Sequence, residues 1–104
     1  MNAAWSALET LKTGINDRHM LSLFKADASR ADIFQCTAGD MLLDYSKTNI
    51  DGAIKAALLE LADAANVTER RAAMFGGAVI NETEGRAVLH TALRNLDGDP
   101  VLVD

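Results

Sequence analysis

The clearest pattern of apolar and polar positions runs over residues 51–65. Apolar side chains recur there with the period of a helix, at Ile54, Ala57, Leu58, Leu61, Ala62 and Ala65. This spacing predicts an amphipathic helix with one continuous apolar stripe. Asp51 stands where an N-cap belongs, and Asn66 stands where the helix is expected to end.

Weaker helical patterns occupy the first third of the chain. Residues 3–13 predict a helix that Gly14 ends, with four apolar side chains near one face: Trp5, Leu8, Leu11 and Ile15. Residues 19–25 predict a short helix for which Asp17 is a suitable N-cap. Asp27 can cap a further short turn of helix, with Ile33 and Phe34 as its apolar end.

A further helix is predicted over residues 69–75, with Thr68 as its cap. The glycine pair at 76–77 follows it directly. Glycine-rich loops can cradle phosphates, but no Gly-x-Gly-x-x-Gly or Walker pattern occurs here. Glycine that ends a helix is far commoner, so we interpret the pair as a helix stop.

The last predicted helix covers residues 84–95, after a short linker at 78–81, with Asn81 or Thr83 as its cap. Three of its side chains, four residues apart, share one face and form a cationic stripe that can hold an anion such as phosphate: Arg86, His90 and Arg94. Glu82 lies four residues before this stripe. Fifteen acidic residues in the chain favour the alternative, in which the stripe forms ion pairs or packs against another part of the protein.

One segment follows a different pattern. Residues 35–38 and 41–45 flank Gly-Asp, a pair that suits a two-residue turn, and they predict a β-hairpin. The apolar run at 41–43 is typical of a strand buried on both faces. No cation stands near Cys36 in sequence to activate its thiol, so we expect a buried strand cysteine. The predicted fold class is mainly α with a small β-hairpin (α+β).

Composition narrows the class of protein. The 104 residues are 49% hydrophobic and 24% charged, which indicates one globular domain and not a disordered chain. The net charge of −5 argues against nucleic acid as a partner. No apolar run suits a membrane span, no secretory signal is visible, and the single cysteine fits a reducing compartment. We therefore expect a cytoplasmic protein.

The candidate chemistry is sparse. His19 and His90 have no second histidine or cysteine at ligand spacing, so a zinc site is not expected. Ser46-Lys47 follows the predicted hairpin, but Ser-Lys catalysis needs a third orienting group and an oxyanion hole, and a turn is the better interpretation. We assign no catalytic, cofactor-binding or metal-ligating residue and expect no cofactor.

Two stretches carry a resemblance to a known family. Residues 40–50, DMLLDYSKTNI, look like an early strand-and-turn segment of glucose-6-phosphate isomerases. Residues 74–95, MFGGAVINETEGRAVLHTALRN, resemble that family's run Met-Phe-x-Gly-x-x-Ile-Asn-x-Thr-Glu-x-Arg-Ala-Val-Leu-His-x-Ala-Leu-Arg-Asn nearly position by position. The two stretches lie in the family's order and spacing. Leu23-Phe24, Asp27, Arg30 and Phe34 also resemble its weaker N-terminal pattern.

This resemblance implies the N-terminal part of an α/β, doubly wound sugar isomerase. The family interconverts glucose 6-phosphate and fructose 6-phosphate in glycolysis and gluconeogenesis without a metal, through an enediol, with a glutamate base and a histidine that helps to open the ring. It implies a homodimer, and the remainder of the isomerase chain as the first partner of residues 1–104. The sugar phosphate is expected to bind only the full-length enzyme.

The chain departs from the family in what it lacks. The phosphate-binding Ser/Thr loop and the catalytic motifs lie further along the family's chain, and His90 does not match the catalytic histidine. We therefore expect a scaffold that is inactive alone and forms one segment without an internal boundary. The alternative is a standalone helical interaction module, which the unterminated apolar run at 101–103 argues against.

Overall fold

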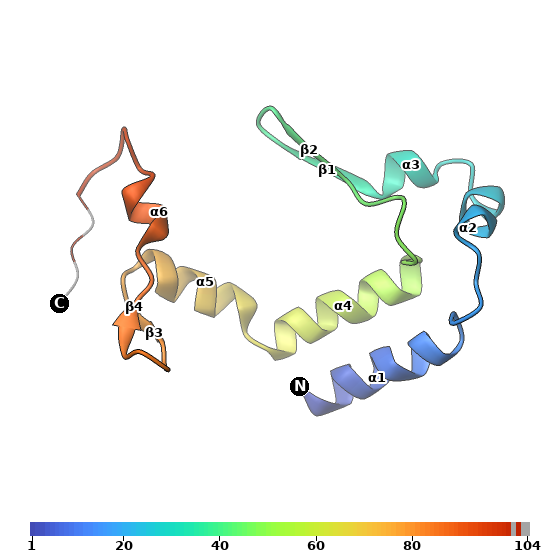
Figure 1. Cartoon of the computed structure of the whole chain (residues 1–104), viewed down its shortest axis with the longest axis horizontal. Helices are drawn as coiled ribbons and strands as arrows, with labels where there is room; N and C mark the ends of the chain where they lie inside the picture. The colour runs from blue at the N-terminus through green and yellow to red at the C-terminus, as the bar shows by residue number, and fades with distance from the viewer. Residues whose placement is uncertain (101, 103–104) are drawn as a thin grey trace. The chain divides into compact units, whose positions relative to one another are not determined.

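A computed structural model describes residues 1–100 and 102 of the chain. They form six helices and four strands: α1 (Asn2–Thr13), α2 (Met20–Ala26), α3 (Arg30–Ile33), β1 (Gln35–Ala38), β2 (Met41–Asp44), α4 (Gly52–Ala64), α5 (Val67–Phe75), β3 (Val79–Asn81), β4 (Arg86–Ala87) and α6 (His90–Leu93) (Figure 1). Most of the run at 101–103 falls outside the described residues.

The chain divides into two compact units. The first is Met1–Leu61 and the second begins at Ala62, so the division falls inside α4. Both contain helices and one antiparallel hairpin. The fold class is therefore helix-rich with two small hairpins, one more than the sequence predicts. In the part of the chain that the structure describes, no helix is both long and apolar enough to cross a bilayer.

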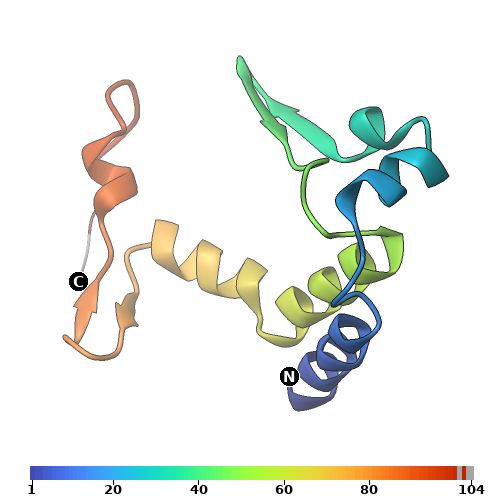
Figure 2. The same ribbon diagram turned by 45° about the vertical axis from the view of Figure 1, so that its right-hand side comes forward.

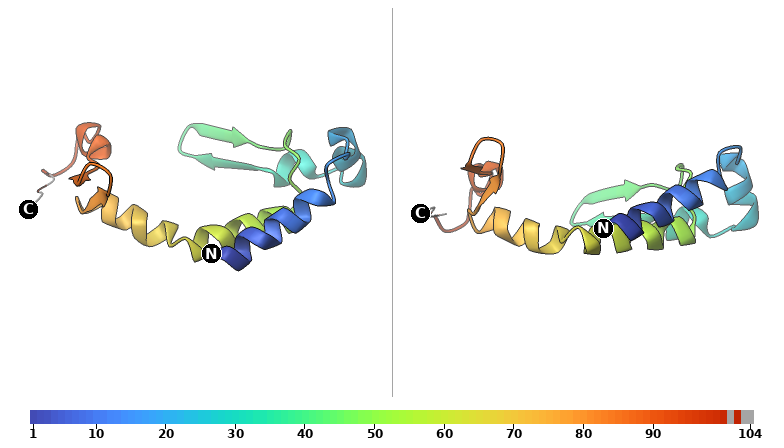
Figure 3. Two further views of the ribbon diagram at one scale, coloured as in Figure 1. Left: turned by 60° about the horizontal axis from the view of Figure 1, so that its bottom comes forward. Right: turned by 90° about the horizontal axis from the view of Figure 1, so that it is seen from below.

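In the first unit, α1 lies beside the N-terminal part of α4 (Figure 3). The predicted apolar face of α1 is confirmed in part. Leu8, Leu11 and, just after the helix, Ile15 are half-buried, whereas Trp5 is exposed. On α4, Ile54 and Ala57 are buried as the stripe predicts. The two helices thus pair along their apolar sides, as amphipathic helices do.

Asp51 caps α4 as predicted. Its carboxylate accepts a hydrogen bond from the Ile54 N–H at 2.9 Å, which satisfies a backbone donor left free in the first turn. Asn66 lies two residues after the last residue of α4, in a left-handed conformation with φ +55°, which asparagine tolerates better than most residues. The best-patterned helix of the sequence therefore begins and ends where the sequence predicts.

Two predicted caps are wrong. His19, not Asp17, precedes α2, and no side chain caps that helix. Helix α5 begins at Val67, so Thr68 lies inside it, and no side chain caps it either. Asp27 does bond the start of a turn, because its carboxylate accepts the Ser29 N–H at 2.9 Å just before α3. Suitable capping residues thus predict that a helix is present better than they predict which residue begins it.

The first hairpin forms as predicted but is not buried. β1 and β2 pair in register from Gln35 opposite Asp44 to Ala38 opposite Met41, with Gly39 at φ +58° in the turn. Every residue of both strands is exposed, including Met41, Leu42 and Leu43 at 73%, 61% and 59%. Figure 2 shows the two strands extending away from α3. Among residues 1–100 and 102, no second layer covers this hairpin. The expectation that the apolar run at 41–43 is buried on both faces is therefore wrong.

In the second unit, the glycine pair ends α5 as predicted. The Gly77 N–H bonds the Met74 carbonyl at 3.2 Å and the Ala78 N–H bonds the Ala73 carbonyl at 3.0 Å. Gly77 has φ +79°. This is the Schellman arrangement, in which a left-handed glycine lets the chain turn back over its own last carbonyls.

The predicted helix over 84–95 is wrong. Strand β4 pairs with β3, the expected linker, with Val79 opposite Ala87 and Asn81 opposite Arg86. Between them the Asn81 carboxamide oxygen accepts the Glu84 N–H at 3.2 Å, and Gly85 takes φ +64°. A glycine in that conformation suits a hairpin turn and costs stability inside a helix. Only His90–Leu93 remain helical in α6.

Candidate functional site

A network of long-range side-chain hydrogen bonds joins two arginines, Arg18 and Arg30, to residues 46–51. We call this network the arginine clasp. Arg30 begins α3 and is only 2% exposed. Its Nε donates to the Ser46 carbonyl at 2.8 Å, and its Nη2 donates to the Thr48 carbonyl at 2.7 Å. One guanidinium edge therefore holds two carbonyls of the turn that follows β2.

Aromatic rings complete the surroundings of Arg30. Its guanidinium carbon lies 4.3 Å from the centre of the Phe34 ring and 5.5 Å from that of Phe24. Phe34 is 5% exposed and meets Tyr45 edge-on, with ring centres 5.5 Å apart. A buried cation needs compensation, which the two carbonyls and the ring faces supply in place of a carboxylate.

Arg18 holds the other end of the same segment. From the loop between α1 and α2, its Nη1 donates to the Asp51 carboxylate at 2.6 Å. Its Nε and Nη2 donate to the side chain and the carbonyl of Asn49 at 2.8 and 3.1 Å. The Asn49 amide in turn donates to the Ile15 carbonyl at 3.3 Å. The clasp therefore ties the N-terminal helices to the start of α4.

Asp51 connects the clasp to the helix cap. The Ile54 N–H and then the Arg18 guanidinium lower the pKa of its carboxyl below the ordinary value, against the opposing effect of burial. Both donors favour the charged form. The carboxylate is thus held ionised by a backbone donor and a side chain from a distant part of the chain.

Ser46 and Lys47 form a turn, as the sequence indicates. Ser46 is 1% exposed, and its N–H donates to the Asp44 carboxylate at 2.9 Å. The Ser46 hydroxyl and N–H, aided by Lys47, hold the pKa of Asp44 below its ordinary value. Lys47 Nζ lies 3.9 Å from Asp44 in an exposed pair. A buried serine beside a lysine paired with a carboxylate is not an activated nucleophile.

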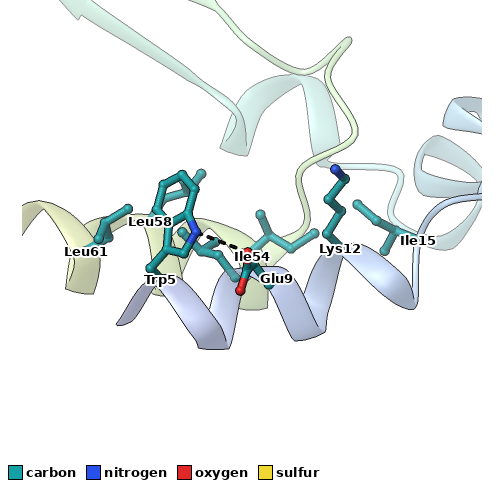
Figure 4. Close-up of a pocket in the computed structure, with 8 residues that line it drawn as sticks. Trp5, Glu9, Lys12, Ile15, Ile54, Leu58 and Leu61 are labelled. Atoms are coloured by element: carbon teal, nitrogen blue, oxygen red, sulfur yellow. Dashed lines mark hydrogen bonds between the residues drawn. The ribbon is translucent and has the colours of Figure 1, made fainter. Parts of the chain in front are cut away.

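A groove opens along the seam between α1 and α4. It has a volume of about 390 Å³ and is lined mainly by apolar side chains: Trp5, Leu8, Ile15, Ile54, Leu58 and Leu61, with Glu9 and Lys12 beside them (Figure 4). The Trp5 indole N–H donates to the Glu9 carboxylate at 3.2 Å. Trp5 and Leu58 remain 56% and 40% exposed. The groove therefore presents mainly apolar surface, with Lys12 and the Trp5-bonded Glu9 as its polar side chains.

The predicted cationic stripe does not form. Arg86 lies in β4, His90 begins α6 and Arg94 follows its end, so the three do not share a helix face. Glu82 pairs instead with Arg70 of α5 at 3.2 Å, where the Arg70 guanidinium also reaches the Ile80 carbonyl at 3.4 Å. The anion-binding hypothesis required three cations on one helix face, and the structure does not provide that face.

The remaining candidates are dispersed. Cys36 is exposed, which corrects the prediction of a buried cysteine, because β1 has no covering layer. His19 and His90 are exposed. Over the residues that the structure describes, no group of three or more potential ligand side chains could hold a metal ion.

Sequence reasoning missed the clasp. The sequence places Arg30 only in the weak N-terminal resemblance, which assigns it no role, and no motif or periodic pattern includes Arg18. Their hydrogen bonds join residues 16 to 33 positions apart, and helical or strand periodicity carries no signal at that range. The available hint was an arginine that stands between two phenylalanines, Phe24 and Phe34, because arginine stacks well on aromatic rings.

Comparison with known proteins identifies the family. A family model described as phosphoglucose isomerase matches residues 44–104. The glucose-6-phosphate isomerase of Ruegeria pomeroyi is 60% identical over 97 residues, which cover 93% of this chain and 18% of that protein. The glucose-6-phosphate isomerase of Cereibacter sphaeroides strain KD131 is 56% identical over 104 residues, which cover 100% of this chain and 19% of that protein.

A more distant relative agrees. The glucose-6-phosphate isomerase of Pseudoalteromonas atlantica is 48% identical over 100 residues, or 96% of this chain and 18% of that protein. The chain therefore spans less than one-fifth of the length of these curated relatives. The clasp draws on both sides of the family-model boundary, since Arg18 and Arg30 precede residue 44 and the segment that they hold follows it. Because the family model matches more than half of its residues, the chain belongs to the phosphoglucose isomerase family.

Proposed function

We propose that the chain is the N-terminal segment of a glucose-6-phosphate isomerase and serves as a scaffold in it. The observation that carries this proposal is the match of the whole chain, at 56% identity, to less than one-fifth of an enzyme of that name. The parent enzyme interconverts glucose 6-phosphate and fructose 6-phosphate, a step of glycolysis and gluconeogenesis. It has the doubly wound α/β sugar-isomerase fold.

The scaffold role rests on what the described residues do chemically. The best-positioned polar side chains, Arg18 and Arg30, are occupied by carbonyls and by a carboxylate of the chain itself. Acid–base work on a sugar needs groups within hydrogen-bond reach of the moving proton. No catalytic role is therefore assigned to residues 1–104, and the reacting groups belong to the remainder of the enzyme.

The same proposal covers partners and location. The segment packs with the remainder of the isomerase chain, the enzyme is a homodimer, and the sugar phosphate binds only the complete protein. No cofactor, nucleic acid or membrane takes part. The net charge of −5 and the lone cysteine support a cytoplasmic enzyme.

The test is a chimera. This chain replaces the matched 97-residue segment of the Ruegeria pomeroyi enzyme, and conversion of fructose 6-phosphate to glucose 6-phosphate is measured. We expect the chimera to turn over and the isolated 104-residue chain to show only background. A folded but inactive chimera would contradict the segment assignment, and turnover by the isolated chain would contradict the scaffold role.

A further inference from the structure

We infer that the groove between α1 and α4 is a docking site for apolar side chains from the remainder of the isomerase chain. This inference rests on the proposed function and adds the place where the segment and the rest of the enzyme meet. Its occupant is part of the same polypeptide, neither a small ligand nor a second copy of the segment.

The first argument is the chemistry of the groove. Its walls are mainly aliphatic and aromatic, and they come from α1, from Ile15 just after α1, and from α4. The Trp5 N–H is satisfied within α1 by Glu9, so an occupant has no need to bring an acceptor. Small-molecule sites combine apolar walls with a few convergent polar groups that fix orientation. The polar side chains of this groove are Lys12 and Glu9, and Glu9 already accepts the Trp5 N–H, so they form no convergent set. This favours apolar side chains of a polypeptide over a metabolite.

The second argument is exposed apolar surface beside the groove. Trp5 is 56% exposed on one wall and Leu58 is 40% exposed on the other. Clustered large apolar side chains on a surface mark a contact. Covering apolar side chains of this size stabilises the folded protein. An enzyme that leaves such a seam uncovered forgoes that stabilisation.

The third argument is length. The matched segment leaves more than four-fifths of each relative's chain outside it, and that polypeptide is tethered directly to the segment. Tethering gives the rest of the chain an effective concentration that a separate molecule does not reach. The remainder of the enzyme is therefore favoured over a second copy as the occupant.

The chain carries a natural reporter for the test, since Trp5 is its only tryptophan and lies in the groove (Figure 4). The isolated chain and the Ruegeria pomeroyi chimera are prepared with 5-fluorotryptophan, and the Trp5 resonance of the chimera is assigned by its loss in Trp5→Phe. Broadening of the fluorine signal by a soluble gadolinium chelate reports solvent access. We expect strong broadening in the isolated chain and at least a several-fold reduction in the chimera.

Two neighbouring residues of α4 supply matched variants. Leu58 lines the groove, whereas Leu59 does not and is more exposed, at 58%. In the chimera, Leu58→Asp should restore broadening of the Trp5 signal, because it places a charge against the occupant. Leu59→Asp should leave Trp5 protected. Equal effects of the two substitutions on Trp5 would overturn the groove as the docking site.

The outcomes separate the two proposals. An active chimera whose Trp5 is broadened as strongly as in the isolated chain overturns this inference and leaves the proposed function standing. A folded, inactive chimera with Trp5 protected contradicts the proposed function and supports a docked groove. Protection in the isolated chain that grows with its own concentration shows a second copy as the occupant and overturns the inference.

Discussion

The two units of the chain are stabilised in different ways. In the first, five residues are buried, and they lie in α3, directly after α3, in the turn after β2 and in α4: Arg30, Phe34, Ser46, Ile54 and Ala57. In the second, the buried residue within the described range is Gly77, which has no side chain. The first unit thus has a small core of its own, and the second has a helix stop and a hairpin turn.

The hydrogen bonds repeat this contrast. Arg18 and Arg30 reach residues 16 to 33 positions away, in buried or half-buried surroundings. The longest side-chain bond described in the second unit joins Arg70 to Glu82, 12 positions apart and exposed. Long-range bonds in low dielectric couple segments strongly, whereas exposed ones contribute little. The first unit is therefore expected to unfold as one cooperative body and the second to open locally.

The largest expected effect is at the clasp. Arg30→Ala leaves the Ser46 and Thr48 carbonyls without their donor and empties the space beside Phe34, and we expect a loss of roughly 3 kcal/mol or more. Urea unfolding followed by circular dichroism measures it. Arg30→Lys keeps the charge but offers no planar fork, so it should rescue only part of the loss. If Arg30→Ala were as stable as the unsubstituted chain, the arginine clasp would not be a source of the difference between the two units.

The next effect, roughly 1 kcal/mol, is at Asp51 and depends on pH. Asp51→Ala removes the cap of α4 together with the partner of Arg18. Because the folded pKa of Asp51 is lowered, its contribution is complete above the ordinary value of 3.8 and is lost as the pH falls through the folded pKa. Thermal unfolding measured from pH 7 to pH 2 should show a smaller loss of stability on acidification in Asp51→Asn than in the unsubstituted chain.

A similar or slightly smaller effect is expected in the second unit. Gly77 takes φ +79°, so Gly77→Ala should cost about 1 kcal/mol. Hydrogen exchange distinguishes where this cost falls. Amides of α5 and β3 should exchange faster, while those of α4 near Ile54 keep their protection. Equal acceleration in both places would show that the two units unfold together and would break the comparison.

The smallest effect is expected at the exposed ion pair. Arg70 and Glu82 have side chains that are 55% and 79% exposed, and such pairs contribute about 0–1 kcal/mol. Arg70→Ala should change the urea midpoint little, and added salt should remove the difference. A loss as large as that of Arg30→Ala would mean that the second unit also depends on long-range polar contacts.

Local chemistry made several elements predictable. The Gly39 turn, the Asp51 cap, the Asn66 helix end and the Gly77 stop each depend on residues within a few positions, and the structure has all four. The prediction of a helix over 84–95 was wrong, and the residues that explain the error are also close together in sequence. Gly85 and Asn81 form a hairpin turn there, and the apolar period of the segment outweighed that turn signal in the prediction.

The sequence by itself determined the family, the helix-rich class, and the first hairpin together with its turn. Only the tertiary structure decided that Cys36 and the apolar strand β2 are exposed, and that two arginines bind the segment at 46–51. Periodicity records which side chains share a face, not what covers that face. Whether a face is buried, and which distant carbonyl a guanidinium reaches, depends on how the whole chain closes on itself.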